Sequence, residues 1–177
     1  MRREQFEHTI RAAGAILGVH ELLVIGSQAI HASVELEIPE AQRSIETDIS
    51  AMEDPDGTAA DLIDGSIGEL SVFQETFGYY AQGVTPATAK LPDGWRSRLV
   101  PFSTPATDGV TALCLEPHDL WLSKAVAGRP KDIEFCRALL ERQIVNPATL
   151  KRRLKKIPDI DSATVESIAG LIKQFAE

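Results

Sequence analysis

The sequence predicts an α/β or α+β protein whose core combines strands and helices and whose C-terminal third is helical. Two observations predict this class. In the first 115 residues, short apolar runs and one alternating segment, both typical of strands, lie between stretches of helical periodicity. Beyond them the periodicity is helical throughout, and several stretches begin at or near a proline, which the first turn of a helix tolerates. We therefore expect an α/β core over residues 1–115 and, packed on it, a helical region over residues 116–177.

The first half of the core is predicted from apolar spacing and from turn residues. Apolar residues three and four apart predict a first helix, which Gly18 can end. A short apolar run then predicts a buried strand, and Gly26-Ser27 turns the chain into a second helix. Strict alternation of apolar and polar residues predicts a half-buried strand after it. The expected elements are helix 2–17, strand 21–25, helix 28–34, strand 45–52 and helix 58–67.

The rest of the chain is predicted in the same way. An aromatic run favours a further strand, and prolines with a glycine break the segment after it into turns. Two short apolar segments favour two more strands, and amphipathic spacing favours helices from there to the end. The expected elements are strand 77–84, loop 86–95, strands 99–102 and 111–115, and helices 117–127, 130–143, 147–156 and 161–176.

The composition is that of a soluble globular protein, with 44% hydrophobic and 25% charged residues in a chain of 177. No apolar run approaches the roughly 18–20 residues that a membrane-spanning helix needs, so we expect no membrane partner. Cys114 and Cys136 lie in apolar surroundings without the spacing of metal ligands. We expect them to be buried, reduced thiols in a cytoplasmic protein.

A strand that ends in Gly26-Ser27 before a helix is a candidate phosphate site. Glycine permits close backbone approach, and the N-terminus of a helix offers free N–H groups to an anion. The Ser27 hydroxyl can add one more donor. Gly-Ser between a strand and a helix is also common as a simple turn, and the spacing alone does not separate the two interpretations.

The alternating segment carries Glu46 and Asp48, which are two residues apart and therefore project from the same face of a strand. Two carboxylates this close repel each other unless a cation or a proton lies between them. Mg²⁺ held by one or two carboxylates and by phosphate oxygens would relieve this repulsion. The alternative is a polar strand edge that faces solvent.

A third candidate group lies at the junction of two predicted C-terminal helices. Lys124 belongs to an otherwise apolar helix, so its ammonium either reaches outward to water or enters a cleft to meet phosphate. Asp132 lies in the first turn of the next helix, where an aspartate is also a good partner for the helix dipole. Arg129 and Lys131 could contact phosphate or merely begin that helix.

Charge is unevenly distributed along the chain, whose net charge of -8 argues against broad non-specific nucleic-acid binding. Residues 35–64 contain ten acids and a single base, which could attract metal ions. Residues 147–157 contain five bases and no acid, which could attract phosphates, unless both segments are solvated faces. The five bases are Lys151, Arg152, Arg153, Lys155 and Lys156. The rings of Phe77, Tyr79 and Tyr80 could also stack against a nucleobase, although aromatic residues in a strand usually belong to the core.

Several of these segments together resemble a known group of proteins. The run from Val24 to Phe135 is similar to a bacterial family of little-characterised nucleotidyltransferase-like proteins, and that family looks related to the toxins of AbiEii-type toxin–antitoxin and abortive-infection systems. The resemblance is carried by Val-Ile-Gly-Ser-Gln-Ala-Ile at 24–30, Glu-Thr-Asp-Ile at 46–49, Asp-Leu-Ile-Asp-Gly at 61–65, Thr-Phe-Gly-Tyr-Tyr-Ala-Gln-Gly-Val at 76–84, Leu-Glu-Pro-His-Asp-Leu-Trp-Leu-Ser-Lys at 115–124 and Ala-Gly-Arg-Pro-Lys-Asp-Ile-Glu-Phe at 127–135.

The resemblance implies a polymerase-β-like, minimal nucleotidyltransferase fold, with a mixed sheet flanked by helices. It implies that Gly26 and Ser27 hold a nucleoside triphosphate, that strand carboxylates hold Mg²⁺ or Mn²⁺, and that Lys124 and Asp132 complete the site. Arg129 would assist nucleotide binding. The implied activity is transfer of a nucleotide to RNA, possibly tRNA, or to a protein, by a toxin that has a cognate antitoxin.

The sequence departs from the wider superfamily at one position. That superfamily carries Asp-x-Asp after the Gly-Ser element, whereas here Asp48 is followed by Ser50 and the paired acid is Glu46. Either the metal pair has shifted to Glu46 and Asp48, or one ligand is lost. Glu116 and Asp119 are candidates for a third acid, although Glu116 could instead cap a helix. The alternative function is therefore a catalytically degenerate module that binds a nucleotide or a partner, and a third is an interaction protein that binds through its C-terminal helices.

Overall fold

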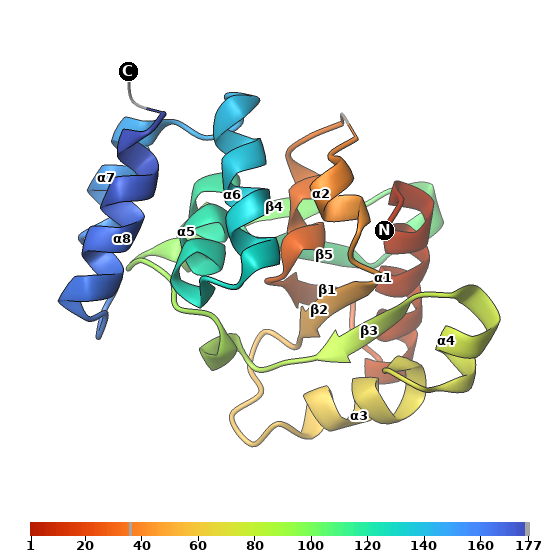
Figure 1. The fold of residues 1–177 in the computed structure, drawn as a ribbon. Helices are drawn as coiled ribbons and strands as arrows, with labels where there is room; N and C mark the ends of the chain where they lie inside the picture. Colours follow the sequence, from red (N-terminus) through yellow and green to blue (C-terminus); the bar gives the residue numbers. More distant parts are fainter. Residues whose placement is uncertain (36, 176–177) are drawn as a thin grey trace.

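The computed structural model describes residues 1–35 and 37–175 and has a five-stranded mixed sheet flanked by helices (Figure 1). The strand order is β3-β2-β1-β5-β4. The pairs β1–β5 and β2–β3 are parallel, whereas β1–β2 and β4–β5 are antiparallel. This confirms the predicted fold class. The strands are β1 (Glu21–Val24), β2 (Glu46–Ser50), β3 (Tyr80–Gly83), β4 (Val100–Phe102) and β5 (Thr111–Cys114).

The predicted helices appear in the predicted order; those that end at residues 17, 67 and 127 end where predicted, and the last three end two or three residues earlier. The helical stretch expected at 28–34 is a short 3-10 helix, η1, and the short helix α2 was not predicted. The helices are α1 (Arg3–Leu17), α2 (Pro39–Gln42), α3 (Thr58–Ile67), α4 (Val72–Phe77), α5 (Pro117–Ala127), α6 (Pro130–Glu141), α7 (Pro147–Leu154) and α8 (Ser162–Lys173), with the 3-10 turns η1 (Ser27–Ala32), η2 (Pro86–Thr88), η3 (Trp95–Arg98) and η4 (Pro105–Thr107).

The start of the predicted strand 77–84 is wrong, because Phe77 is the last residue of helix α4. Ser71 caps this helix by accepting a hydrogen bond from the Gln74 amide at 3.2 Å. Gly78 ends it with a φ of 77°, a left-handed conformation that glycine adopts without strain. Local capping therefore overrides the strand preference of the aromatic run, and β3 begins only at Tyr80.

Strand β2 divides its side chains between the two faces of the sheet, as the alternation predicted. Thr47 and Ile49 are fully buried on the face on which α1 packs. Glu46 and Asp48 project from the opposite face. In the parallel ladder with β3 they lie beside Tyr80 and Gln82, respectively, so all four side chains share that face.

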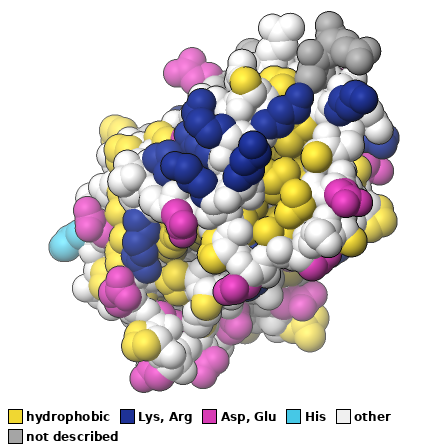
Figure 2. Space-filling view, turned by 90° about the vertical axis from the view of Figure 1, so that its left-hand side faces the viewer, with side chains coloured by type: hydrophobic (Ala, Val, Ile, Leu, Met, Phe, Trp, Pro, Cys, Tyr) yellow, Lys and Arg dark blue, Asp and Glu magenta, His cyan; other side chains and the backbone are white. Residues whose placement is uncertain are grey.

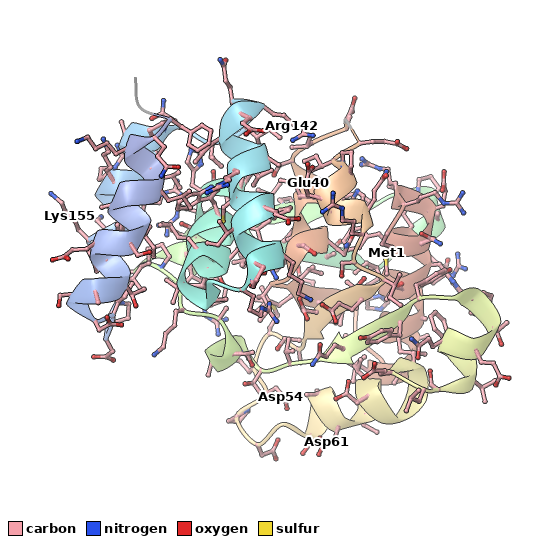
Figure 3. All side chains as sticks on the ribbon, viewed as in Figure 1. Met1, Glu40, Asp54, Asp61, Arg142 and Lys155 are labelled. Atoms are coloured by element: carbon pink, nitrogen blue, oxygen red, sulfur yellow. The ribbon has the colours of Figure 1, made fainter. Side chains whose placement is uncertain are left out.

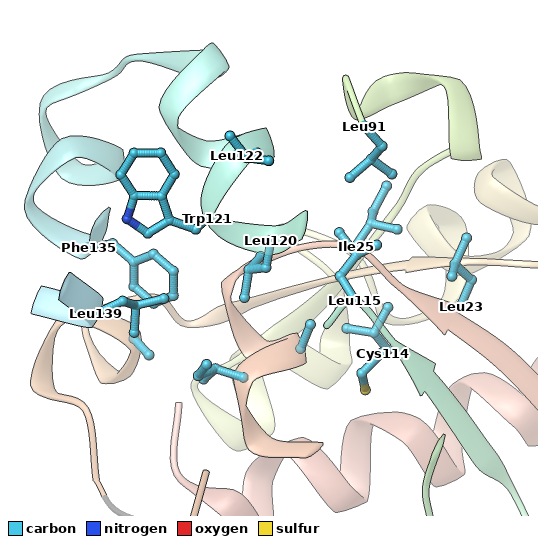
Figure 4. Close-up of a cluster of buried hydrophobic side chains, with 14 of the residues drawn as sticks. Leu23, Ile25, Leu91, Cys114, Leu115, Leu120, Trp121, Leu122, Phe135 and Leu139 are labelled. Atoms are coloured by element: carbon cyan, nitrogen blue, oxygen red, sulfur yellow. The ribbon is translucent and has the colours of Figure 1, made fainter. Parts of the chain in front are cut away.

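Helix α5 joins the sheet to the C-terminal helices. Its residues Leu120 and Leu122 are fully buried, and they lie in the same apolar cluster as Ile25 (Figure 4). The Trp121 indole N–H donates a hydrogen bond to the Cys136 carbonyl at 2.8 Å, which ties α5 to α6. One hydrophobic core cluster contains residues from both sides of position 115, and the predicted division at that position stays a prediction.

A smaller contact ties α6 to α2. The side chains of Arg142 and Glu40 lie close together above the sheet (Figure 3), with 3.3 Å between Arg142 Nη2 and Glu40 Oε2. Cys114 and Cys136 are both buried and free, as predicted. Among the described residues, no helix combines the length and the apolar character needed to span a bilayer.

Candidate functional site

The connection between β1 and η1 brings Gly26 against the side chain of Asp48. The Ile25 amide donates to the Asp48 carbonyl at 3.3 Å, which fixes the two segments side by side. A Cβ atom built on Gly26 would lie 1.7 Å from Asp48 Oδ2, so no larger residue fits there without moving the carboxylate. The glycine of the Gly-Ser motif is thus required by Asp48 itself, a reason that the sequence alone did not reveal.

Asp48 faces a cavity of about 240 Å³, which Lys124 and Arg129 also line. Within residues 1–35 and 37–175, no group donates a hydrogen bond to its carboxylate. Burial raises the pKa of Asp48, Lys124 lowers it, and the negative charge of Glu46 raises it further. Asp48 is half-buried and borders this open cavity, so a cation or another ligand in the cavity could meet its carboxylate directly.

Lys124 enters the cleft instead of reaching outward to water. Its side chain is 12% exposed, and its Nζ atom lies 3.7 Å from Asp132 Oδ1. Asp132 is buried and also accepts hydrogen bonds from Arg129, with 2.6 Å to Nε and 3.3 Å to Nη2. One buried carboxylate therefore holds two cations at the wall of the cavity that Asp48 faces.

Ser27 and Glu46 lie on the other side of Lys124. They line a second cavity of about 110 Å³, together with Lys124 and Asp132. Glu46 accepts a hydrogen bond from the Tyr80 hydroxyl at 3.1 Å and pairs with Lys131 Nζ at 3.3 Å. The structure thus brings all of the predicted site residues around Lys124, but it gives Glu46 partners that Asp48 lacks.

The acids available for a metal are few. In residues 1–35 and 37–175, no group of three or more His, Cys, Asp or Glu side chains is placed to hold a metal ion together. Ser50 shares the face of Glu46 and Asp48, but it is buried and donates its hydroxyl to the Ala51 carbonyl at 2.7 Å. Level with Ser50, β1 and β5 offer only Leu23 and Leu113, which are apolar.

Glu116 and Asp119 do not supply the third acid, so this expectation is corrected. Glu116 caps α5 by accepting from the His118 amide at 3.2 Å, and it pairs with Arg153. Asp119 is 1% exposed and pairs with Arg98 at 2.7 Å and with Arg153 at 2.9 Å. Neither acid lines the two cavities that Lys124 borders, because arginines already hold both of them.

The basic segment splits between two environments. Arg153 points inward to Glu116 and Asp119, so it belongs to this ion-pair network and not to an exposed basic surface. Leu150 and Leu154 bury the apolar side of α7. The side of the molecule on which α7 and α8 lie has Lys and Arg side chains gathered over part of it (Figure 2). The exposed bases of this segment are Lys151, Arg152, Lys155 and Lys156.

Some residues near the cavities were not singled out from the sequence. Gln82 and Lys90 both line the cavity of Asp48. Side chains two residues apart on a strand share a face, so strand alternation could have placed Gln82 beside Tyr80. Lys90 lies in a loop, where no sequence pattern indicates the direction of a side chain. Tyr79 and Tyr80 are buried, which agrees with the core interpretation of these aromatic residues.

The chain was compared with known proteins. A family model described as "Nucleotidyltransferase of unknown function (DUF6036)" matches residues 6–158. No curated protein and no solved structure matched the chain. The matched range includes every residue of the two cavities that Lys124 borders.

Proposed function

We propose, from the premise that the chain belongs to this family of nucleotidyltransferases, that it catalyses metal-dependent transfer of a nucleotide from a nucleoside triphosphate to an acceptor. In such a reaction, an acceptor oxygen bonds to the α-phosphorus, the bond to pyrophosphate breaks, and the acceptor hydroxyl loses its proton. The protein's main tasks are therefore alignment and charge stabilisation.

One observation carries the proposal. Asp48 is a half-buried carboxylate without a hydrogen-bond donor among the described residues, and it faces a cavity whose wall holds Lys124 and Arg129. An acid and two cations around one cavity suit a ligand that brings both a metal ion and phosphate groups. In the cluster around Asp119 every charge has a partner, whereas here Lys124 and Arg129 pair with Asp132 and Asp48 is left open to the cavity.

Each residue has a role that its contacts support. Gly26 leaves room for the carboxylate of Asp48, and Ser27 offers a hydroxyl to a phosphate oxygen at the second cavity. Lys124 and Arg129 would counter the negative charge of the triphosphate. Asp132 accepts from Arg129 and pairs with Lys124, so it is better suited to orient these cations than to accept a proton from the acceptor.

The fit to a divalent metal is strongest at Asp48. Mg²⁺ or Mn²⁺ bound there would neutralise the triphosphate and polarise its α-phosphate. Asp48 has the unsatisfied oxygens that such an ion needs, and Glu46 is two residues away on the same strand face. Because Glu46 already has Tyr80 and Lys131 as partners, it would have to release Lys131 to act as a second ligand.

The test is transfer of label from each of the four α-labelled triphosphates, with Mg²⁺ or Mn²⁺, to total RNA and to lysate protein. We expect transfer by the wild type and a loss of about 100-fold or more in Asp48→Asn and Lys124→Met. Lys173→Gln, an exposed change at the end of α8, is the matched control and should keep full activity. Failure of all four triphosphates with both acceptor pools would refute the proposal.

For the acceptor, we propose an RNA such as tRNA, with a protein as the alternative acceptor. The exposed bases of the α7 segment support RNA, because they could neutralise phosphates of its backbone. The double variant Lys155→Gln/Lys156→Gln should weaken RNA labelling and reduce its salt dependence. Labelling of lysate protein that is equal in this variant and the wild type, without labelled RNA, would favour a protein acceptor.

We further propose that the reaction takes place in the cytoplasm and is toxic, with a cognate antitoxin as partner. This rests on the resemblance to AbiEii-type toxins and goes beyond the family match. Induced expression should arrest bacterial growth, and Asp48→Asn should abolish the arrest at an equal protein level. Equal growth arrest by both proteins would show that toxicity does not need the site.

Ser50 favours a second candidate function, a nucleotide- or partner-binding module that lacks catalysis. It replaces an acid of the wider pattern, is buried, and donates its hydroxyl to backbone. This candidate predicts a rise in melting temperature with a triphosphate and metal, but no transfer to any acceptor. Transfer above the level of Asp48→Asn would exclude it.

A further inference from the structure

The negative charge of the chain comes from one continuous segment. Residues 44–89 contain nine acids and no lysine or arginine, whereas the whole chain has a net charge of -8. The remaining residues therefore carry a net charge of +1, taking histidine as neutral. This segment forms β2, α3, α4 and β3, so these elements contribute carboxylates and no lysine or arginine to the surface, and the cations that reach Glu46 and Glu53, Lys131 and Arg96, come from other parts of the chain.

The same segment carries the exposed large hydrophobic side chains of the described residues. Leu70 is 93% exposed, Val72 76%, Leu62 50% and Phe77 46%. Ile45, which directly precedes β2, is the fifth, so all five lie in this segment. Exposed apolar side chains that gather on one side of a protein usually mark a surface that another molecule covers.

Leu70 is unusual in its backbone conformation as well as in the exposure of its side chain. Its φ is 62°, in the left-handed region that a branched side chain rarely adopts. The Leu70 amide donates to Gln74 Oε1 at 2.5 Å, which fixes the turn between α3 and α4 and holds the leucine outward. A strained residue that presents an apolar side chain to water contributes little to folding, which is the pattern expected of a binding residue.

We propose that the turn and outer faces of α3 and α4, centred on Leu70 and Val72, form a docking surface for a basic, apolar segment of another protein. Charge complementarity identifies this occupant. Glu69 and Glu75 are exposed beside the apolar pair, and no base in residues 44–89 competes for them. A nucleic acid would be repelled by this surface, so the proposal does not overlap with the RNA acceptor.

The acidic surface continues from α3 to the sheet. Asp64, Glu69 and Glu46 line a hollow of about 500 Å³ with Tyr80 and Gln82. A lysine or arginine of the docked segment could enter this hollow and meet Asp64 and Glu69, since Glu46 already pairs with Lys131. The hollow shares Glu46 and Gln82 with the two cavities beside Lys124, so a partner there would lie next to the candidate site. The docking proposal itself does not require nucleotide transfer.

The test is selection from a library of random peptides displayed on phage, with the purified full chain as target. We expect enriched peptides to carry net positive charge together with leucine, isoleucine or aromatic residues. Their affinity, measured by fluorescence anisotropy, should fall by about tenfold or more in Leu70→Ser/Val72→Ser and in Glu69→Lys/Glu75→Lys. Amide hydrogen exchange should slow around residues 62–77 when the peptide binds.

Two control variants show whether the effect is local. Ile45→Ser removes an exposed apolar side chain outside the docking surface, and Glu166→Lys reverses an exposed acid on α8. Neither should change affinity by more than about twofold. The proposal is overturned if enriched peptides are neutral or acidic, if nothing is enriched, or if the docking variants bind as well as the wild type. A wild type that is dimeric by light scattering and becomes monomeric in Leu70→Ser/Val72→Ser would show that a second copy, not a basic partner, covers the surface.

Discussion

Helix α5 carries two clusters of charged residues, and they differ in how completely their charges are paired. At its N-terminal end, Glu116 and Asp119 are held by Arg153, Arg98 and His118. At its C-terminal end, Lys124 pairs with Asp132 beside a cavity, while Asp48 across that cavity lacks a hydrogen-bond donor among the described residues. Both clusters are largely buried, so burial alone does not distinguish them.

The difference suggests that a structural charged residue has all of its hydrogen-bonding positions filled by the protein, whereas a functional one keeps some of them free. In the N-terminal cluster even His118 is fully used, because its Nε2 accepts from the Asn146 amide at 2.9 Å and its Nδ1 lies 2.6 Å from Glu116. This cluster links α5 to α7 and to η3 and leaves no oxygen of Asp119 free. The cluster at Lys124 leaves Asp48 available to a ligand, as a binding site requires.

The largest effect is expected from Asp119→Ala. Asp119 is 1% exposed and holds two arginines, so its removal leaves Arg98 without an acidic partner and Arg153 with Glu116 alone. Breaking a buried ion pair in this way typically destabilises a protein by about 3–5 kcal/mol. Urea unfolding should show this loss of unfolding free energy. A loss below about 1 kcal/mol would mean that the cluster is not structural, and the contrast between the two ends of α5 would fail.

The next effect is the pH dependence contributed by Glu116. Burial alone would raise its pKa, but hydrogen bonds from His118 and Arg153 and the charge of Arg153 lower it from 4.5 to about 2. Since the folded-state pKa is the lower one, the stabilisation is complete above about pH 4.5 and is lost as the pH falls towards 2. The difference in unfolding free energy between wild type and Glu116→Gln should be about 2–3 kcal/mol at neutral pH. It should shrink at pH 3, and a constant difference would contradict the assignment.

A smaller effect is expected where Gly26 meets Asp48. In Gly26→Ala the new methyl group would overlap Asp48 Oδ2, so we expect a loss of about 1–3 kcal/mol and a displaced carboxylate. Stabilisation by triphosphate and metal, measured as a melting-temperature shift, should disappear as well. Gly65→Ala is the matched control, because nothing lies within 4 Å of its added Cβ and α3 should gain up to about 1 kcal/mol. Unchanged stability and ligand response in Gly26→Ala would show that the contact is loose.

The sequence alone predicts the strands, the C-terminal helices and the residues that surround Lys124, because these depend on local periodicity and on turn residues. It does not predict that Lys124 enters the cleft, since outward and inward lysines have the same pattern until Asp132 is placed beside it. Nor does it predict that Arg153 leaves the basic segment for Asp119, which is 34 residues away in the chain. Such pairings depend on tertiary packing, which sequence spacing does not encode.

The smallest effect is the most direct test of the open carboxylate. Burial raises the pKa of Asp48, so its charged form is disfavoured in the folded state, and the penalty is present at neutral pH and relieved as the pH falls through the folded-state pKa. Asp48→Asn removes this charge while keeping the shape of the side chain. Without ligand, the free energy of unfolding at pH 7 should therefore be about 0.5–1 kcal/mol higher for the variant than for the wild type, a gain that is common when a functional residue is replaced. The advantage should diminish as the pH falls through the folded-state pKa of Asp48, where the wild-type carboxyl gains a proton. Triphosphate with Mg²⁺ should stabilise the wild type and not the variant.

A variant less stable than wild type at pH 7 would mean that Asp48 is a paired structural charge like Asp119. The comparison between the two charge clusters of α5 would then no longer separate functional residues from structural ones.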